Sequence, residues 1–331
     1  MTAMLSLFLA AALSLPADFH AGRSQRGVVQ SDQTFEAAAL SWSADSEVVV
    51  RVRVSDDARD WSQWIPLTID DDISDPSAGR YLTAITHFDS AKRYVEYAFS
   101  QEVDRVTVTM FPPPSEHHRI ATESFPLGPL TIRSREDWGC PDGESSPLWA
   151  PMHTIVTHAV VHHSAGSNTL INWEAELRNI WYFHTYTNGW GDIGYNYLID
   201  PNGVIYEGRA GGEGIIGAHF SCRNSNTVGI ALLGTFTSAS PTDAALNSLK
   251  GLLTEVSRRN GIDPLATVHH PSSGLDLPTI LGHRDGNVPG ATCTITECPG
   301  DVLYSMLPAF RSEISATLNA PPPLRRRAAR P

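Results

Sequence analysis

The chain has 331 residues, enough for about two domains of roughly 100–200 residues each. Its 41% hydrophobic and 18% charged residues are ordinary for a globular protein and argue against wholesale disorder. Its formal net charge of −12 argues against nucleic acid as a partner, because phosphate binding depends on clustered Lys and Arg.

The chain begins with an apolar run from Ala3 to Leu15, followed by Pro16 and Ala17. This pattern is typical of a secretory signal peptide, although a positively charged start is missing, and it predicts a leader over residues 1–22. An anchor or a misplaced start is the alternative. The run is short for a membrane span and no other segment is long enough, so we expect no stable membrane insertion. We expect a monomer that is secreted or associated with a cell wall.

Residues 30–125 have the alternating pattern of half-buried strands, as in "EVVVRVRVSDD" and "DRVTVTMF". Turn-rich stretches such as "DDDISDPSAG" separate these runs, which predicts a small all-β, sandwich-like domain. We expect Trp61 and Trp64 in its core; an exposed platform for a ligand is the alternative.

From residue 132 to 318, strand and helix patterns alternate. "HTIVTHAVVHH" and "TVGIALLGTF" predict strands, "NWEAELRNIWYFHTY" predicts a helix, and "YNYLIDPNGVIYEG" predicts a hairpin. A helix follows Pro241, and "DVLYSMLPAFRSEI" predicts another that is interrupted or ends near Pro308. This order indicates an α/β domain with a mixed sheet. The Pro- and Arg-rich residues 319–331 predict a disordered tail.

Side chains from three distant parts of the chain suggest a metal site. His162 and His163 end a strand, where successive side chains point to opposite faces, so only one of them can enter a given site. His283 ends the apolar strand "TILGH", and Cys298 lies in the loop beyond it. One histidine of the pair, His283 and Cys298 would suit Zn²⁺ and leave a fourth position for water. A disulfide at Cys298 is the alternative that spacing leaves open.

Five motifs carry a resemblance to a known family. "SREDWG", "VVHHSAG", "GWGDIGYNYLIDPNGVIYEGRAGG", "GAHFSCRNSNTVGIALLGTF" and "GHRDG" followed by "TECPGD" occur in the order seen in peptidoglycan recognition proteins and type 2 N-acetylmuramoyl-L-alanine amidases. The resemblance covers roughly residues 134–314. It implies a mixed central β-sheet flanked by helices, and the β-rich segment before it resembles the accessory region of secreted bacterial members.

Carried over by position, the resemblance assigns the zinc ligands of the family to His162, His283 and Cys298, which favours His162 over His163. The family's catalytic tyrosine matches Tyr195 in "IGYN". A second catalytic position falls on Thr296, where phage-type amidases have lysine and animal enzymes have threonine.

The family reaction is zinc-dependent hydrolysis of the amide between N-acetylmuramic acid and L-alanine of peptidoglycan. A protein that binds peptidoglycan without cutting it, and a purely structural zinc, are the alternatives. His184, Trp190, Arg209 and His219 resemble groove-lining, substrate-binding positions; packing, salt-bridge or loop-stabilising roles are the alternatives. The adjacent residues Gly189 and Trp190 resemble the residue pair found in family members that prefer peptidoglycan with meso-diaminopimelate stems over lysine stems.

The resemblance also bears on the remaining cysteines. The family fold would place the loops of Cys222 and Cys293 on the active-site side, and we expect a disulfide between them. A Cys293–Cys298 disulfide would consume the metal ligand, and sequence spacing does not decide between the two. The β-rich domain could in addition tether the protein to a wall polymer or a partner.

Overall fold

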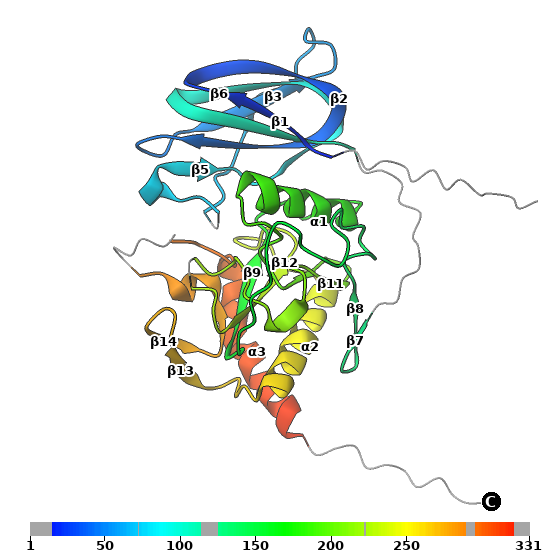
Figure 1. The fold of residues 1–331 in the computed structure, drawn as a ribbon, viewed down its shortest axis with the longest axis vertical. Coiled ribbons are helices and arrows are strands. Elements are labelled where there is room, and N and C mark those ends of the chain that lie inside the picture. Colours follow the sequence, from blue (N-terminus) through cyan, green and yellow to red (C-terminus); the bar gives the residue numbers. More distant parts are fainter. Residues whose placement is uncertain (1–14, 72, 114–124, 222, 289–294, 321–331) are drawn as a thin grey trace, which may run out of the picture.

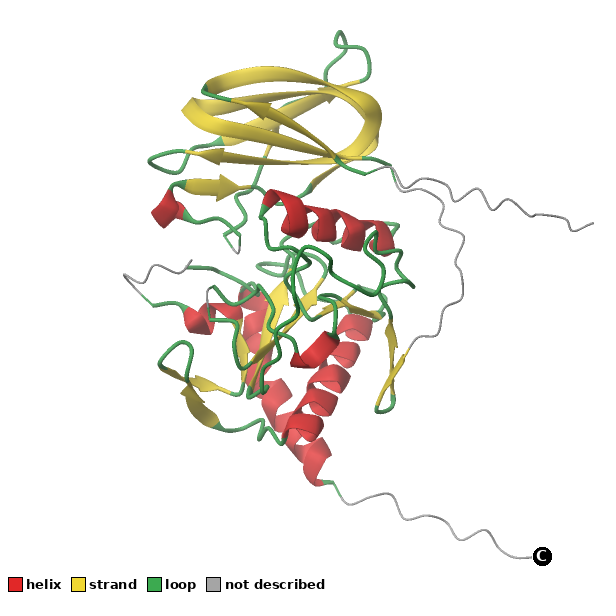
Figure 2. Ribbon diagram, viewed as in Figure 1, coloured by secondary structure: helices red, strands yellow, loops and turns green. Residues whose placement is uncertain are grey.

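The computed structural model describes residues 15–71, 73–113, 125–221, 223–288 and 295–320. They form two units, an N-terminal β domain of residues 17–111 and a C-terminal α/β domain of residues 125–319 (Figures 1 and 2). The expected fold class, a mixed sheet flanked by helices after a small all-β domain, is confirmed. Among the described residues, no helix is both long enough and apolar enough to cross a bilayer.

The N-terminal domain is one six-stranded sheet that curves around its own core. Alternate valines of "VRVRVS" are buried as the alternation predicts. The expectation that Trp61 and Trp64 belong to the core is wrong, because both are half-buried and the guanidinium of Arg53 lies 4.9 Å from each ring. The elements are β1 (Ala17–Ala21), β2 (Ser24–Ser43), β3 (Val50–Ser55), β4 (Ile65–Pro66), the 3₁₀ turn η1 (Pro76–Ala78), β5 (Arg80–Leu82) and β6 (Thr86–Phe111).

Strand β1 bears on the expected leader. Residues 17–21 pair with residues 106–110 of β6, so the predicted leader of residues 1–22 overlaps a strand of this sheet. A cut at or before Pro16 would leave the strand intact. Residues 1–14, which hold most of the apolar run, lie outside the described residues, as do residues 321–331 of the predicted tail.

The C-terminal domain is built on a seven-stranded mixed sheet in the order β15-β9-β12-β10-β11-β8-β7. The predicted hairpin is present as β10 and β11, with Gly203 at φ +80° in its turn, a conformation that favours glycine. The strands are β7 (Phe125–Leu127), β8 (Leu130–Arg133), β9 (His158–His163), β10 (Tyr197–Ile199), β11 (Ile205–Glu207), β12 (Thr227–Leu232) and β15 (Ile280–Gly282), with a separate hairpin of β13 (Thr267–His270) and β14 (Leu275–Pro278).

Helices cover both faces of this sheet. On one face α2 and α3 bury their apolar stripes in a core with alternate strand residues, and on the other face α1 packs through residues such as Leu177 and Trp181. Helix α1 therefore lies between this sheet and the N-terminal domain (Figure 1). The helices are α1 (Trp173–Tyr182), α2 (Asp243–Asn260) and α3 (Asp301–Asn319), with the π-helical turn η2 (Phe183–Thr187) and the 3₁₀ turns η3 (Gly212–Gly214) and η4 (His283–Gly286).

Helix α3 differs from the prediction, because it continues through Pro308. A proline inside a helix removes one hydrogen bond and costs about 3 kcal/mol. Leu303 and Leu307 before the proline and Phe310 and Ile314 after it are all buried in the same core. Burial of these four side chains on both sides of an exposed proline outweighs the local cost.

The two domains touch along α1 and the turn that follows it. His87 of β6 lies 3.0 Å from the carboxylate of Glu176 in α1, and the hydroxyl of Tyr182 donates to Asp18 at 3.4 Å. A small apolar cluster joins Phe111 of β6 to Phe183 of η2. The domains are thus in direct contact on the side of the sheet to which His162, near the end of β9, points.

Candidate metal centre

The end of β9 separates the two neighbouring histidines as strand geometry predicts. His162 points to the face shared with Tyr195, His219 and His283, whose rings lie 4.7–5.2 Å from its own. His163 points the other way, and its Nδ1 accepts a hydrogen bond from the backbone of Phe236. Only His162 therefore belongs to the cluster.

His162, His283 and Cys298 come together at this point. Their candidate ligand atoms all lie within 4.8 Å of one another, and all three residues are buried. Tetrahedral zinc with Zn–S of about 2.3 Å and Zn–N of about 2.0–2.1 Å separates a sulfur and a nitrogen ligand by about 3.5 Å. Cys298 Sγ and His162 Nδ1 are 3.5 Å apart. The donor types and this distance fit zinc.

A relay of hydrogen bonds orients His162. The Thr227 hydroxyl donates to the carbonyl of Asn224 at 2.7 Å, so its oxygen accepts from Nε2 of His219 at 3.3 Å. Nδ1 of His219 then accepts from Nε2 of His162 at 3.0 Å, which directs the Nδ1 lone pair of His162 toward Cys298. Gly229 leaves room for this ring, since a Cβ there would lie 2.4 Å from the ring of His219.

Hydrogen bonds also fix the other two members of the cluster, His283 and Cys298. Ser221 Oγ lies 2.9 Å from Nε2 of His283. The backbone N–H of Cys298 donates to the hydroxyl of Thr296 at 2.9 Å, and the backbone N–H of His163 donates to the sulfur of Cys298 at 3.4 Å. The backbone N–H of Arg284 donates to the carbonyl of Cys298 at 2.9 Å, which ties the cysteine loop to η4.

Burial keeps the imidazoles of His162 and His219 neutral, and the neutral form is the one that binds metals. Burial, together with the neighbouring His283, His219 and His163, holds the pKa of His162 well below its ordinary value. Burial, with His283 and Arg209, lowers the pKa of His219 to about 3. In contrast, burial raises the pKa of the distant Cys140 thiol to about 12, so that thiol stays protonated.

Tyr195 lies beside the cluster, with its ring 5.2 Å from that of His162 and 5.6 Å from that of His184. Nδ1 of His184 accepts from the backbone N–H of Gly194 at 3.0 Å, so its proton is on Nε2. The half-buried ring of Trp190 lies 4.7 Å from His184. His184 and Trp190 thus line the space next to Tyr195.

Two of the expected substrate-binding residues, Arg209 and His219, are buried. Arg209 is 2% exposed, and its guanidinium donates to the carbonyls of Trp190 at 2.7 Å and Ile193 at 3.0 Å. It therefore holds the loop that carries Trp190, and this loop contact replaces the salt bridge considered from sequence. His219 is 5% exposed and contacts His162, as described above.

Sequence patterns did not identify two hydroxyl groups that contact the imidazoles: Ser221, beside His283, and Thr227, beside His219. Thr227 begins a strand recognisable only as apolar, and no spacing pairs it with His219. Cys222 and Cys293 lie outside the described residues, and so does the expected disulfide between them. Cys298 is present as a thiol next to His162.

Comparison with known proteins adds independent findings. Residues 152–301 match the family described as N-acetylmuramoyl-L-alanine amidase. Peptidoglycan-recognition protein SC2 of Drosophila simulans is 34% identical over 178 residues, which cover 53% of this chain and 84% of that protein. The N-acetylmuramoyl-L-alanine amidase of Homo sapiens is 32% identical over 188 residues, 56% of this chain and 29% of that protein. The solved structure of Drosophila PGRP-LB is 30% identical and covers 53% of this chain and 91% of that chain, with a TM-score of 0.41.

Proposed function

Since the chain belongs to the family of peptidoglycan-recognition proteins and type 2 N-acetylmuramoyl-L-alanine amidases, we propose that it is a zinc-dependent amidase. Its substrate would be peptidoglycan, and the bond cut would be the amide between N-acetylmuramic acid and L-alanine. The observation that carries the proposal is the convergence of two imidazoles and one thiol within 4.8 Å, beside Tyr195.

His162, His283 and Cys298 would hold the metal. Zinc in such a site supplies Lewis acidity, which activates water and polarises the scissile carbonyl. The chain's own part is to fix the three donors. The relay from Thr227 through His219 fixes the ring of His162, and Thr296 holds the backbone of Cys298.

Tyr195 would act on the substrate directly. A phenol at this position can donate a hydrogen bond to the oxygen of the amide as negative charge develops there. The donor would strengthen its interaction in the transition state, which is the condition for raising the rate of the chemical step. Thr296 would serve as a positioning residue, because its hydroxyl already accepts from the backbone of Cys298.

Recognition of the substrate would involve His184 and Trp190, which line the space beside Tyr195. Arg209 would shape that space through its hold on the Trp190 loop. The pair Gly189 and Trp190 supports a preference for meso-diaminopimelate stems. Secretion, a monomeric state and the Cys222–Cys293 disulfide complete the proposal.

The test compares the wild-type protein with Cys298→Ala and with Cys140→Ala as a matched control, a buried thiol away from the cluster. Zinc content and release of free stem peptide from purified peptidoglycan are measured for each. We expect about one zinc per chain and peptide release for wild type and Cys140→Ala, and loss of both for Cys298→Ala. A wild-type protein that binds zinc and peptidoglycan but releases nothing would establish the binding-only alternative.

A further inference from the structure

A loop of the N-terminal domain reaches the metal centre of the other domain. The loop joins β4 to β5, and its described residues are 67–71 and 73–79; we call these residues the cover loop. The carboxylate of Asp71 accepts a hydrogen bond from the backbone N–H of Glu297 at 2.6 Å. Glu297 directly precedes Cys298, so the cover loop is bonded to the segment that carries a proposed metal ligand.

An apolar contact joins the domains next to this bond. Ile73 of the cover loop is 5% exposed and belongs to a buried cluster that includes Phe183 of η2, with Trp190 and Ile85 packed against it. Phe183 directly precedes His184 in the chain. The cover loop is therefore docked by one charge-assisted hydrogen bond and one buried side chain, both beside residues of the site.

Little space remains between the cover loop and the reactive side chains. Asp70, Ile73 and Ile85 lie opposite His184 and Tyr195 across a cavity of about 20 Å³. A single water needs about 10–15 Å³ of such volume, so neither a sugar nor a peptide fits there.

We propose that the N-terminal domain is an autoinhibitory cover: in this docked form, the described residues of the cover loop keep substrate from Tyr195, and catalysis requires the cover loop to move away. The inference rests on the amidase function proposed above and adds its regulation. It also assigns the β domain a part distinct from tethering.

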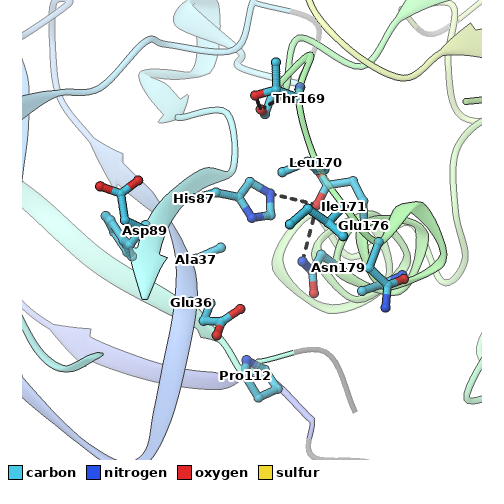
Figure 3. Close-up of a pocket in the computed structure, with 14 residues that line it drawn as sticks. Glu36, Ala37, His87, Asp89, Pro112, Thr169, Leu170, Ile171, Glu176 and Asn179 are labelled. Atoms are coloured by element: carbon cyan, nitrogen blue, oxygen red, sulfur yellow. Dashed lines mark hydrogen bonds and ion pairs between the residues drawn. The ribbon is translucent and has the colours of Figure 1, made fainter. Parts of the chain in front are cut away.

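The rest of the domain contact is suited to a reversible interface. On the far side of Glu176, the domains line an open pocket of about 660 Å³ (Figure 3). Glu36 and His87 of the N-terminal domain face Glu176 and Asn179 of α1 there, and the polar contact of His87 with Glu176 at 3.0 Å links the two sides of the pocket. Interfaces of this kind, polar and incompletely packed, permit domain motion. The contact is thus tight beside Tyr195 and looser along α1, where this pocket lies.

The experiment uses the full chain with Asp71→Ala or Ile73→Ser. Asp45→Ala and Val49→Ser are matched controls, since both residues are exposed positions of the same domain. The first measurement is the alkylation rate of Cys298 in metal-free protein, followed by mass spectrometry of its peptide. The second is stem-peptide release from a soluble muramyl peptide by zinc-loaded protein. Thermal unfolding checks the fold, and Asp71→Ala, on a half-buried loop position, provides the variant least able to disturb it.

Loss of a hydrogen bond to a charged group is enough to shift an open–closed equilibrium by about tenfold or more. We expect Cys298 to be alkylated about tenfold faster in each variant, with faster peptide release, and wild-type values in both controls. Unchanged alkylation in both variants would overturn the cover. Faster alkylation without release by any of the proteins would uphold the cover and refute the amidase. Release of stem peptide with unchanged alkylation of Cys298 would uphold the amidase and refute the cover.

Discussion

Replacement of His219 by alanine tests whether the relay to His162 sets the metal affinity. The change removes the acceptor 3.0 Å from Nε2 of His162, a side chain that is 0% exposed. A buried donor left unsatisfied costs about 1–3 kcal/mol, which corresponds to roughly 5- to 150-fold in affinity. Loss of the partner of a metal-binding histidine typically costs about 10–100-fold. We therefore expect zinc to bind about 10- to 100-fold more weakly.

The assay is competition for zinc with a chromogenic chelator at constant pH. His219→Gln should recover part of the affinity, because its amide oxygen can accept from His162. Thr227→Val should lose less than His219→Ala, since it removes only the far end of the relay. His269→Ala, at an exposed histidine, is the control. Urea unfolding of the metal-free proteins separates folding from metal binding. Wild-type zinc affinity in a folded His219→Ala protein would refute the relay.

Tyr195→Phe should slow stem-peptide release by about 10²–10³-fold and leave the zinc content unchanged, since only the oxyanion donor is lost; an unchanged rate would remove Tyr195 from the chemistry. Burial lowers the pKa of His87, but the hydrogen bond and charge of Glu176 and the charge of Glu36 raise it to a net value above the ordinary 6.5. The protonated His87 therefore stabilises the fold fully below about pH 6.5, and this contribution is lost as the pH rises through the raised pKa. The melting temperature of wild type should fall more over that window than that of His87→Gln, and parallel curves would contradict this. Pro308→Ala should raise the free energy of unfolding in urea by up to about 3 kcal/mol, because an exposed proline inside α3 is replaced by the best helix former; a loss of stability would show that Pro308 has a role beyond the helix.

The sequence predicts the candidate metal site through local patterns together with the family resemblance. Strand alternation allows only one residue of the pair His162 and His163 into the site, and the structure has them on opposite faces. His283 and Cys298 follow a strand and a loop that the motifs place at the same sheet edge. Donor type and strand alternation are local properties that suggest candidates, whereas the choice of His162, His283 and Cys298 as one set comes from the family resemblance.

The surroundings of the cluster depend on contacts that are remote in sequence. Gly229 matters because its missing side chain admits the ring of His219, which is a property of packing and not of any motif. The stretch "DDDISDPSAG" looks like a simple break between strands, yet Asp71 within it bonds to a residue 226 positions away. The course of α3 through Pro308 likewise follows from core packing on both sides of the proline.

Because Glu297 and Cys298 are adjacent in the chain, docking of the cover loop and binding of the metal are linked equilibria. The same short segment presents an N–H to Asp71 and a sulfur to the metal cluster, so ordering the segment for one interaction favours the other. Thermodynamic linkage requires the effect to be mutual: docking of the cover raises metal affinity by the factor by which the metal strengthens docking. A protein that has lost its metal would therefore hold its cover less tightly, and a docked cover would slow the loss of the metal.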